Sequence, residues 1–288
     1  MLLNSKTIKK KYLLKNNDII SLMKFNDKVY NNNKYIYSNK DLKVNIYYED
    51  KNILIINKQP GQIVHPGHGN YKNTLVNWLK YYYNKFNYTN NNEFNNRFGL
   101  LHRLDKDTSG LLMIAKNILT FNYIKNQFIN RTIKKTYIAL IWGIPLKNKG
   151  IIKNYIGRNK FNRIKMTVVN KNYKGKLSIT KYKIIKKFNI FSLIKCKLKT
   201  GRTHQIRVHF KNIGHPIFND KLYGGDKILN KNRKYYKKII YLLKILPRQA
   251  LHAYSLIYKD PETKKNKKII SKLPNDIKIA IKYIKYNF

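Results

Sequence analysis

Short apolar runs bounded by turn residues are the main hydrophobic pattern of this chain. Residues 53–57 (Ile-Leu-Ile-Ile-Asn) form such a run, and the Gln-Pro-Gly that soon follows is typical of a turn. Further strand-like runs cover residues 110–116, 136–142, 151–156, 178–187 and 191–198. Strands with irregularly placed helices between them predict an α+β domain built on a mixed, mostly antiparallel sheet with flanking helices.

Helical spacing of apolar residues is clear in a few segments. Thr74 is a suitable N-cap for a helix in which Leu75, Trp78, Leu79 and Tyr82 recur at helical intervals. We also expect helices over residues 119–128, 203–210 and 276–284, the last opened by a proline. The asparagine-rich residues 84–96 are expected to form a loop.

The first part of the chain has a different texture. Residues 1–45 are rich in lysine and asparagine and show weak periodicity. They predict a helix around Asp18–Phe25 and a short ribbon at Lys28–Ile36. We therefore expect a small appendage over residues 1–45 and a main domain over residues 46–288.

The charge of the chain is strongly positive. It has 61 Lys+Arg against 13 Asp+Glu in 288 residues, a formal net charge of +48. Such a field favours a polyanionic partner, and nucleic acid is the leading candidate. An AT-rich genome would also raise the lysine content, so part of the excess is expected on ordinary solvated faces. Arginine is the clearer signal, because its planar guanidinium suits sites that bind anions through two donors.

Cysteine content and hydropathy bear on the compartment. The single cysteine, Cys196, excludes an internal disulfide and a cysteine-based zinc site. No apolar run approaches the ~18 residues that span a bilayer, and the N-terminal residues do not resemble a secretory signal. We expect a cytoplasmic protein without membrane contact; an organellar transit peptide is a weaker alternative.

Two dense motifs carry candidate chemistry. The first, residues 102–110, holds Asp105 and Asp107, the only acids between Glu93 and Asp220. Asp105 is predicted on a loop between two short buried strands, at the mouth of a central cleft.

The second motif, Gly201–His209, contains two arginines, two histidines and a glutamine but no acid. It therefore needs an anion from elsewhere in the fold. We expect Arg202 to pair with Asp105 and to keep that carboxylate ionised as a nucleophile or base. The alternative is a purely structural ion pair.

Other chemistries are less well supported. His102, Asp105, His204 and His209 could be imagined around a metal ion, but such sites normally recruit several carboxylates or cysteines, which this region lacks. A Ser109–His102 nucleophile pair is weaker still. The glycines do not follow a phosphate-loop spacing, so we expect no metal and no cofactor.

Several ordered motifs together resemble one known family. Residues 102–111 (His-Arg-Leu-Asp-Lys-Asp-Thr-Ser-Gly-Leu) are similar to the signature loop of the RluA/RluD family of pseudouridine synthases. Matching segments follow the family order: 57–61, 64–67, 135–137 (Lys-Thr-Tyr), 201–209, 223–225 and 248–253. The resemblance covers residues 47 to 275, and the motif details are most similar to the branch that acts on large-subunit rRNA.

The resemblance implies a pseudouridine synthase fold and specific roles. Asp105 would be the catalytic aspartate, Tyr137 the active-site tyrosine that stacks on uracil, and Arg202 the basic partner of the aspartate. Arg103 would fill the space left by a flipped-out base, and Leu251 would line the uracil pocket. Further RNA- or substrate-binding roles are expected for His102, His204, Gln205 and Arg207.

The expected activity is therefore isomerisation of uridines in 23S-type rRNA of a large-subunit precursor, by a monomer without an obligatory protein partner. Two alternatives stay open: a tRNA-directed synthase of the same family, and a catalytically silent rRNA-binding assembly factor. Asp18–Leu42 resembles only the core of an S4 RNA-binding domain, so residues 1–45 are expected to form a degenerate S4-like RNA-binding arm.

Overall fold

The computed structural model describes residues 2–3, 6–7, 16–21, 36–67, 69–84, 93–228 and 230–288. The chain divides into two compact units, Met1–Tyr37 and Ser38–Phe288. The main unit thus begins eight residues before the boundary expected between residues 45 and 46.

The first unit contains a three-stranded antiparallel sheet of β1 (Leu2–Leu3), β2 (Lys6–Thr7) and β3 (Ile20–Ser21) in the order β2-β1-β3. The helix expected at Asp18–Phe25 is wrong where it can be compared, because Ile20–Ser21 is a strand. Asp18 and Ile19 are not helical either, whereas residues 22–25 of that helix and all of the ribbon at Lys28–Ile36 except its last residue lie outside the described residues. The S4-like character of this segment stays a prediction.

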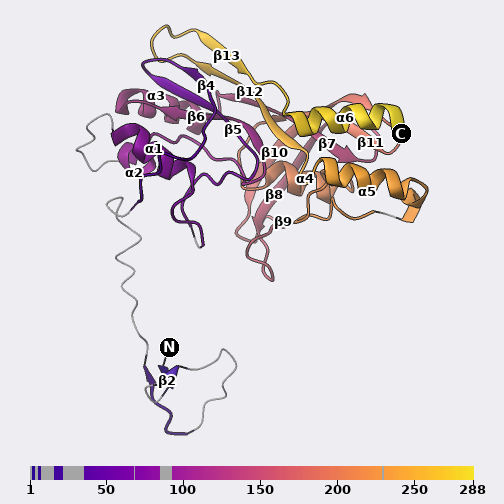
Figure 1. The fold of residues 1–288 in the computed structure, drawn as a ribbon, viewed down its shortest axis with the longest axis horizontal. Coiled ribbons are helices and arrows are strands. Elements are labelled where there is room, and N and C mark those ends of the chain that lie inside the picture. The colour runs from indigo at the N-terminus through magenta and orange to yellow at the C-terminus, as the bar shows by residue number, and fades with distance from the viewer. Residues whose placement is uncertain are drawn as a thin grey trace. The chain divides into compact units, whose positions relative to one another are not determined.

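The second unit is built on a 10-stranded sheet (Figure 1). Its path runs β4-β5-β6-β12-β7-β11-β10-β8-β9, with β13 paired to β12. Only the β6–β12 pair is parallel among these described strands. The mixed, mostly antiparallel sheet expected from the sequence is confirmed. Its strands are β4 (Ile46–Glu49), β5 (Ile53–Lys58), β6 (Ser109–Ala115), β7 (Lys134–Trp142), β8 (Lys149–Arg158), β9 (Met166–Val169), β10 (Lys176–Lys187), β11 (Phe191–Leu198), β12 (Leu251–Lys259) and β13 (Asn266–Ile270).

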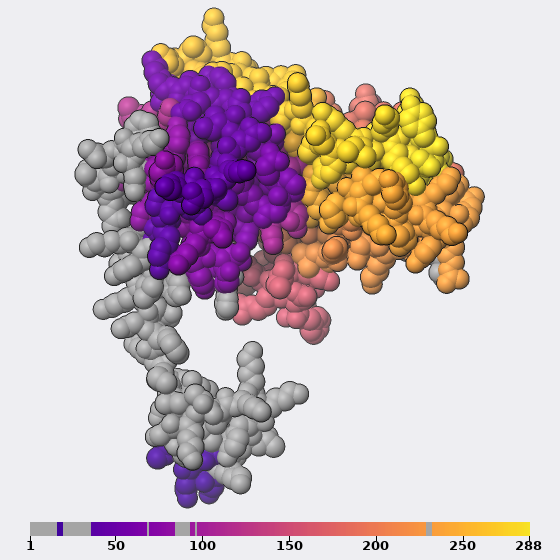
Figure 2. Space-filling view, viewed as in Figure 1, coloured from indigo at the N-terminus to yellow at the C-terminus, as the bar shows by residue number. Residues whose placement is uncertain are grey.

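Helices flank this sheet at both ends. In Figure 1, α1, α2 and α3 gather at the end near β4 and β5, and α5 and α6 lie side by side at the other, where they appear orange and yellow in Figure 2. No helix in the described part of the chain has the length and apolar character needed to cross a bilayer. The helices are α1 (Leu75–Asn84), α2 (Glu93–Arg97), α3 (Ile118–Ile129), α4 (Gln205–Asn212), the 3-10 helix η3 (Asn230–Tyr235), α5 (Tyr236–Ile245) and α6 (Asn275–Asn287).

Local sequence explains the elements that were expected correctly. Strands β5 and β6 are buried along nearly their whole length, so their continuous apolar runs match a sheet covered on both faces. Helix α1 begins directly after Thr74, whose backbone N–H and hydroxyl both donate to the side-chain oxygen of Asn77. This reverse contact satisfies a donor at the helix start, as in a capping box.

Several expectations are corrected by the structure. Helix α2 begins inside the segment expected to be a loop. Leu100 forms only an isolated bridge to Ile114, so the strand expected before Asp105 is absent from this described segment. Strands β4, β9, β12 and β13 and helix α5 were not expected. β12 escaped notice because its buried face carries polar residues such as His252 and Ser255, which break the apolar pattern.

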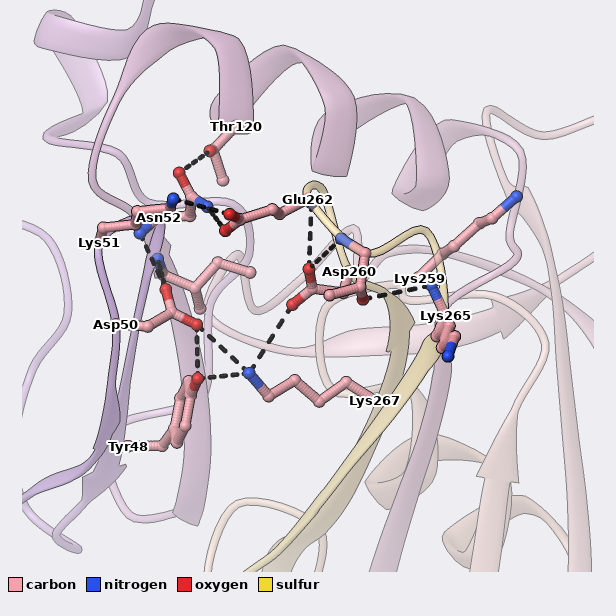
Figure 3. Close-up of polar contacts among 12 residues, drawn as sticks. Tyr48, Asp50, Lys51, Asn52, Thr120, Lys259, Asp260, Glu262, Lys265 and Lys267 are labelled. Carbon is pink, nitrogen blue, oxygen red and sulfur yellow. Dashed lines mark hydrogen bonds and ion pairs between the residues drawn. The ribbon is translucent and has the colours of Figure 1, made fainter.

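A network of acids and lysines joins the β4–β5 hairpin to the β12–β13 hairpin (Figure 3). Lys267 on β13 bonds to the hydroxyl of Tyr48 and lies 3.3 Å from Asp50 Oδ2. The Lys51 ammonium lies 2.7 Å from Glu262 Oε1. In this network, Lys51 and Lys267 each pair with an acidic side chain.

Candidate active site

A cavity of about 420 Å³ opens beside Asp105. It adjoins a smaller cavity of about 60 Å³, and both are lined by Arg103, Asp105, Tyr137, Leu198 and Arg202. The central cleft expected from the sequence is therefore present. Leu251, His204 and Arg207 line the smaller cavity, and His102 lines the larger.

Strand order explains why residues far apart in sequence meet at this cleft. Asp105 lies just before β6, and β6 runs parallel to β12, with Gly110 opposite Ala253. On the other side of β12, Ala253 pairs with Tyr137 of β7. The loop that carries Asp105, the start of β12 at Leu251 and the ring of Tyr137 therefore converge at one edge of the central sheet.

The loop of Asp105 is held by buried cations from two sides. The ammonium of Lys58, which is 1% exposed, donates to the carbonyl oxygens of Lys106 at 2.7 Å, Gln59 at 2.8 Å and Gln62 at 2.9 Å. Arg248 donates to the carbonyl oxygen of Asp107 at 3.0 Å. These bonds position the carbonyl groups of Lys106 and Asp107, the two residues that follow Asp105.

Asp105 is paired with Arg207. Arg207 Nη1 donates to Asp105 Oδ2 at 2.9 Å, while Nε and Nη2 donate to Asp220 at 2.7 and 2.8 Å. Burial lowers the pKa of Arg207, but the Asp220 and Asp105 carboxylates outweigh burial and raise that pKa overall. The guanidinium is thus a permanent charge between two acids.

This pairing corrects the expectation that Arg202 is the partner of Asp105. Arg202 forms no ion pair among the described residues, and it lines both cavities instead. Arg207, expected to bind RNA, is buried on α4 and carries the pairing role. The physical reason is that α4 begins at Gln205, so its first turn directs Arg207 inward, whereas Arg202 stays on the preceding loop.

His204 faces the other oxygen of Asp105. Its Nε2 lies 3.8 Å from Asp105 Oδ1, and its Nδ1 lies 2.8 Å from the hydroxyl of Tyr223. The Tyr223 hydroxyl accepts from the backbone N–H of Met166 at 3.0 Å, and burial raises the pKa of Tyr223 to about 12. The tyrosine therefore keeps its proton and can donate it to Nδ1, which places the histidine proton on Nε2, toward Asp105.

The protonation of the histidine is set by burial. Burial lowers the pKa of His204, and the nearby Asp105 carboxylate opposes this effect only in part. His204 is also the residue before α4 and has a left-handed backbone with φ of 55°. The lowered pKa favours a neutral imidazole beside Asp105.

Tyr137 is buried on β7 and lines both cavities. Burial and the negative charge of Asp105 both raise the pKa of its hydroxyl well above the ordinary value. The side chain therefore stays a neutral phenol, with an aromatic face suited to packing against a flat base.

Gln205 has structural contacts that the sequence did not reveal. Gln205 is 3% exposed, and its oxygen accepts from Thr200 and from the Arg202 backbone while its nitrogen donates to Ile179 and Thr180. Its side chain is fully hydrogen-bonded to the loop before α4 and to β10, so it positions these elements; its expected RNA contact stays a prediction.

His102 accepts from the backbone N–H of Met113 at 3.0 Å and packs on the ring of Phe128. Burial, helped by the charge of Lys135, lowers the pKa of His102 to about 3, so the ring is neutral. The contact ties the loop of Asp105 to β6. Arg103, next to it, is exposed at the mouth of both cavities.

Some residues of the site were not assigned from the sequence. Asp220 completes the grip on Arg207, Tyr223 orients His204, and Lys58 holds the loop of Asp105. Lys135 lines the larger cavity. The acid-free Gly201–His209 motif was a signal for an external anion such as Asp220, but sequence spacing cannot say which acid supplies it.

In the described part of the chain, no three His, Cys, Asp or Glu side chains come together in an arrangement that could hold a metal ion. His209, one of the histidines considered for such a site, is fully buried and bonds to the Thr180 hydroxyl at 2.9 Å.

A partly exposed aspartate therefore lies among basic side chains in a cleft of this mixed sheet. A family model described as RNA pseudouridylate synthase matches residues 52–212. The chain belongs to the RNA pseudouridylate synthase family, and within it to the RluA/RluD group, and it is an RNA pseudouridine synthase.

Individual relatives agree with this assignment. The chain is 42% identical over 250 residues to ribosomal large subunit pseudouridine synthase D of Buchnera aphidicola subsp. Schizaphis graminum, covering 85% of this chain and 75% of the relative. It is 35% identical over 290 residues to an uncharacterized RNA pseudouridine synthase of Chlorobaculum parvum, covering 99% and 86%.

Solved structures give the same fold. Human RNA pseudouridylate synthase domain containing 1 matches with a TM-score of 0.60 at 25% identity, covering 81% of this chain and 84% of that one. The human domain containing 4 protein matches with a TM-score of 0.64 at 23% identity, covering 84% and 93%.

Proposed function

We propose that this protein converts uridines of large-subunit ribosomal RNA to pseudouridine, with Asp105 as the catalytic group. The observation that carries the proposal is the placement of the Asp105 carboxylate. It is 19% exposed at the cavity, 2.9 Å from Arg207 Nη1 and 3.8 Å from His204 Nε2. A carboxylate that is oriented by a permanent cation at the edge of a cavity is placed to act as a nucleophile or a base.

The reaction is an isomerisation that balances without a co-reactant. Asp105 acts on the ribose, covalently or as a base, while the bond between N1 of uracil and C1′ breaks. The freed uracil turns and forms a new bond from C5 to C1′. C5 then loses its proton, and N1 ends with one. Tyr137 packs against the uracil and assists the removal of the C5 proton.

The target nucleotide must leave its stack to reach Asp105. Flipping costs about a few kcal/mol, which base stacking and phosphate contacts offset. Arg103, exposed at the mouth of the cleft, is suited to occupy the space that the base vacates, and Leu251 to line the uracil pocket.

The choice of rRNA is supported by the relatives of the synthase D type, which carry ribosomal large subunit in their names. The net charge of +48 agrees with a large polyanionic substrate. We place the activity in the cytoplasm, in a monomer that needs no protein partner.

The test is pseudouridine mapping of total RNA from bacterial cells that lack their own synthase D and express either this chain or Asp105→Asn. New pseudouridines in large-subunit rRNA that disappear with Asp105→Asn are expected. Sites confined to tRNA would move the substrate to tRNA. No new site with a folded, RNA-binding protein would favour the silent assembly factor.

A further inference from the structure

One wall of the larger cavity carries positive charge that the protein does not neutralise. The wall is formed by Lys135 of β7 and by Lys199 and Arg202, which follow β11. Strand pairing brings them together, because Leu198 lies opposite Lys135 in the β7–β11 register. We call Lys135, Lys199 and Arg202 the cation wall.

The ammonium of Lys135 is held deep in this wall. Its Nζ occupies the space beside Gly201, where an added Cβ would lie only 2.7 Å away. It also lies 5.3 Å from the centre of the Phe128 ring. Burial lowers the pKa of Lys135 to about 8. Removing a cation from water is unfavourable, and an anion nearby would offset that penalty.

No protein anion meets that need. Within the described residues, the ion pairs include neither Lys135 nor Arg202. Asp105, the only acid among the described residues that line the cavity, is already engaged by Arg207 and faces His204. By contrast, Lys51 and Lys267 in the network that joins the two hairpins each pair with an acidic side chain (Figure 3).

Arg202 adds an unpartnered donor to the same wall. Its Nε is buried and has no hydrogen-bond partner. Its backbone is fixed, because its N–H donates to Gln205 Oε1 at 3.0 Å. A fixed backbone limits where the guanidinium can go, so it stays beside the cavity that it lines.

We propose that the cation wall binds one backbone phosphate of the RNA adjoining the flipped nucleotide, with the half-buried Lys135 as its principal contact. The inference rests on the proposed function, which puts the flipped nucleotide beside Asp105. A neutral uracil offers no charge to this wall, whereas a phosphodiester offers a charged group with two accepting oxygens. Anchoring that phosphate fixes the ribose, so that C1′ faces Asp105.

The first experiment compares the affinity of an RNA hairpin containing the uridine found by mapping for the wild type, Lys135→Met and Lys134→Met. Lys134 is the exposed neighbour on β7 and serves as the matched control. Lys135→Met should weaken binding about tenfold and reduce the salt slope by about 1. Equal affinities for the two variants would overturn the proposal.

A second measurement locates the phosphate. The hairpin is made with one neutral methylphosphonate at a time in the linkages around the target. One linkage should weaken binding to the wild type but cause no further loss with Lys135→Met. If every linkage weakens both proteins equally, the proposed contact is wrong.

Gly201→Ala separates geometry from charge. The new methyl group displaces the flexible end of Lys135, keeps every charge and introduces no strained backbone. RNA affinity should fall severalfold while the melting temperature is nearly unchanged. Unchanged affinity would contradict a role for the observed position of the ammonium.

A probe free of RNA keeps the outcome distinct from the proposed function. Lys135 is followed by NMR of dimethylated lysines and assigned by its loss in Lys135→Met. Inorganic phosphate should raise the pKa of the Lys135 amine, which this resonance reports. A rise without any pseudouridine formation would support the anion site and overturn the proposed function. Pseudouridine formation without a response of Lys135 to phosphate, and without an effect of any single linkage, would support the proposed function and overturn the anion site.

Discussion

Arg207 and Asp105 are joined by a 2.9 Å hydrogen bond between Nη1 and Oδ2, and the same guanidinium grips Asp220 through two further bonds. The Asp220 side chain is 1% exposed and that of Arg207 7%. Asp220 therefore orients the arginine, and the arginine orients Asp105. This chain of contacts links the packing of α4 to the position of the Asp105 carboxylate.

Removal of Arg207 should damage both the fold and the activity. Arg207→Met leaves Asp220 buried and unpaired, which we expect to reduce the free energy of unfolding by about 3–5 kcal/mol. Turnover should be lost even at temperatures at which the variant is folded. Urea unfolding and single-turnover pseudouridine formation measure the two effects.

Arg202→Met is the matched comparison, because Arg202 lies in the same motif but in no ion pair of the described residues. We expect its unfolding free energy to change by less than about 1 kcal/mol while RNA affinity falls. Equal destabilisation by both variants would contradict the assignment of Arg207 as the structural partner.

Gly110 is required by the close approach of β6 and β12. It has φ of +114°, and an added Cβ would lie 2.3 Å from the carbonyl oxygen of Ala253. Gly110→Ala should lower the unfolding free energy by more than about 2 kcal/mol, through backbone strain and overpacking. Gly67→Ala, where a Cβ meets no atom within 4 Å, is the control and should be nearly neutral. Thermal melts of both proteins provide the check.

Lys58 should make stability depend on pH. Burial lowers the pKa of Lys58 from 10.5 to about 7 in the folded protein. Between these values the unfolded chain binds the extra proton, so the contribution of Lys58 to folding becomes more favourable as pH rises and is lost as pH falls toward 7. From pH 7 to 9, the wild type should gain about 1–2 kcal/mol of unfolding free energy relative to Lys58→Met.

The control for this pH effect is Lys106→Met, since Lys106 is an exposed lysine of the neighbouring loop. Its difference from the wild type should stay constant over the same range. A constant difference for Lys58→Met as well would show that the Lys58 ammonium keeps its proton in the folded protein.

Tyr223 should act on catalysis through His204. Tyr223→Phe removes the donor to His204 Nδ1 at 2.8 Å and the acceptor for Met166 N–H at 3.0 Å. The imidazole is then free to change its tautomer, so we expect turnover to fall severalfold and its pH profile to shift, with RNA affinity kept. Tyr182→Phe, whose hydroxyl bonds to the Lys147 carbonyl oxygen instead, should leave the profile unchanged.

Local pattern was enough to predict much of the fold. The apolar runs of β5 and β6 and the helical spacing of α1 are patterns among neighbouring residues. They could therefore be interpreted without the rest of the chain. Scarcity of acids singled out Asp105 in the same way. β12 could not be predicted, because its buried His252 is satisfied by Ser109 and Ser271, residues far away in sequence.

The sequence by itself identified the components of the site: a loop that carries Asp105, a strand that carries Tyr137 and a motif that contains Arg202 and Arg207. Only the tertiary structure decided that Arg207 pairs with Asp105, that Arg202 remains unpaired, and that Lys135 enters the cavity beside Gly201. Secondary-structure signals depend on spacings of a few residues. Pairings between charged groups depend on how helices and strands are oriented when they pack, and that orientation is set by the whole fold.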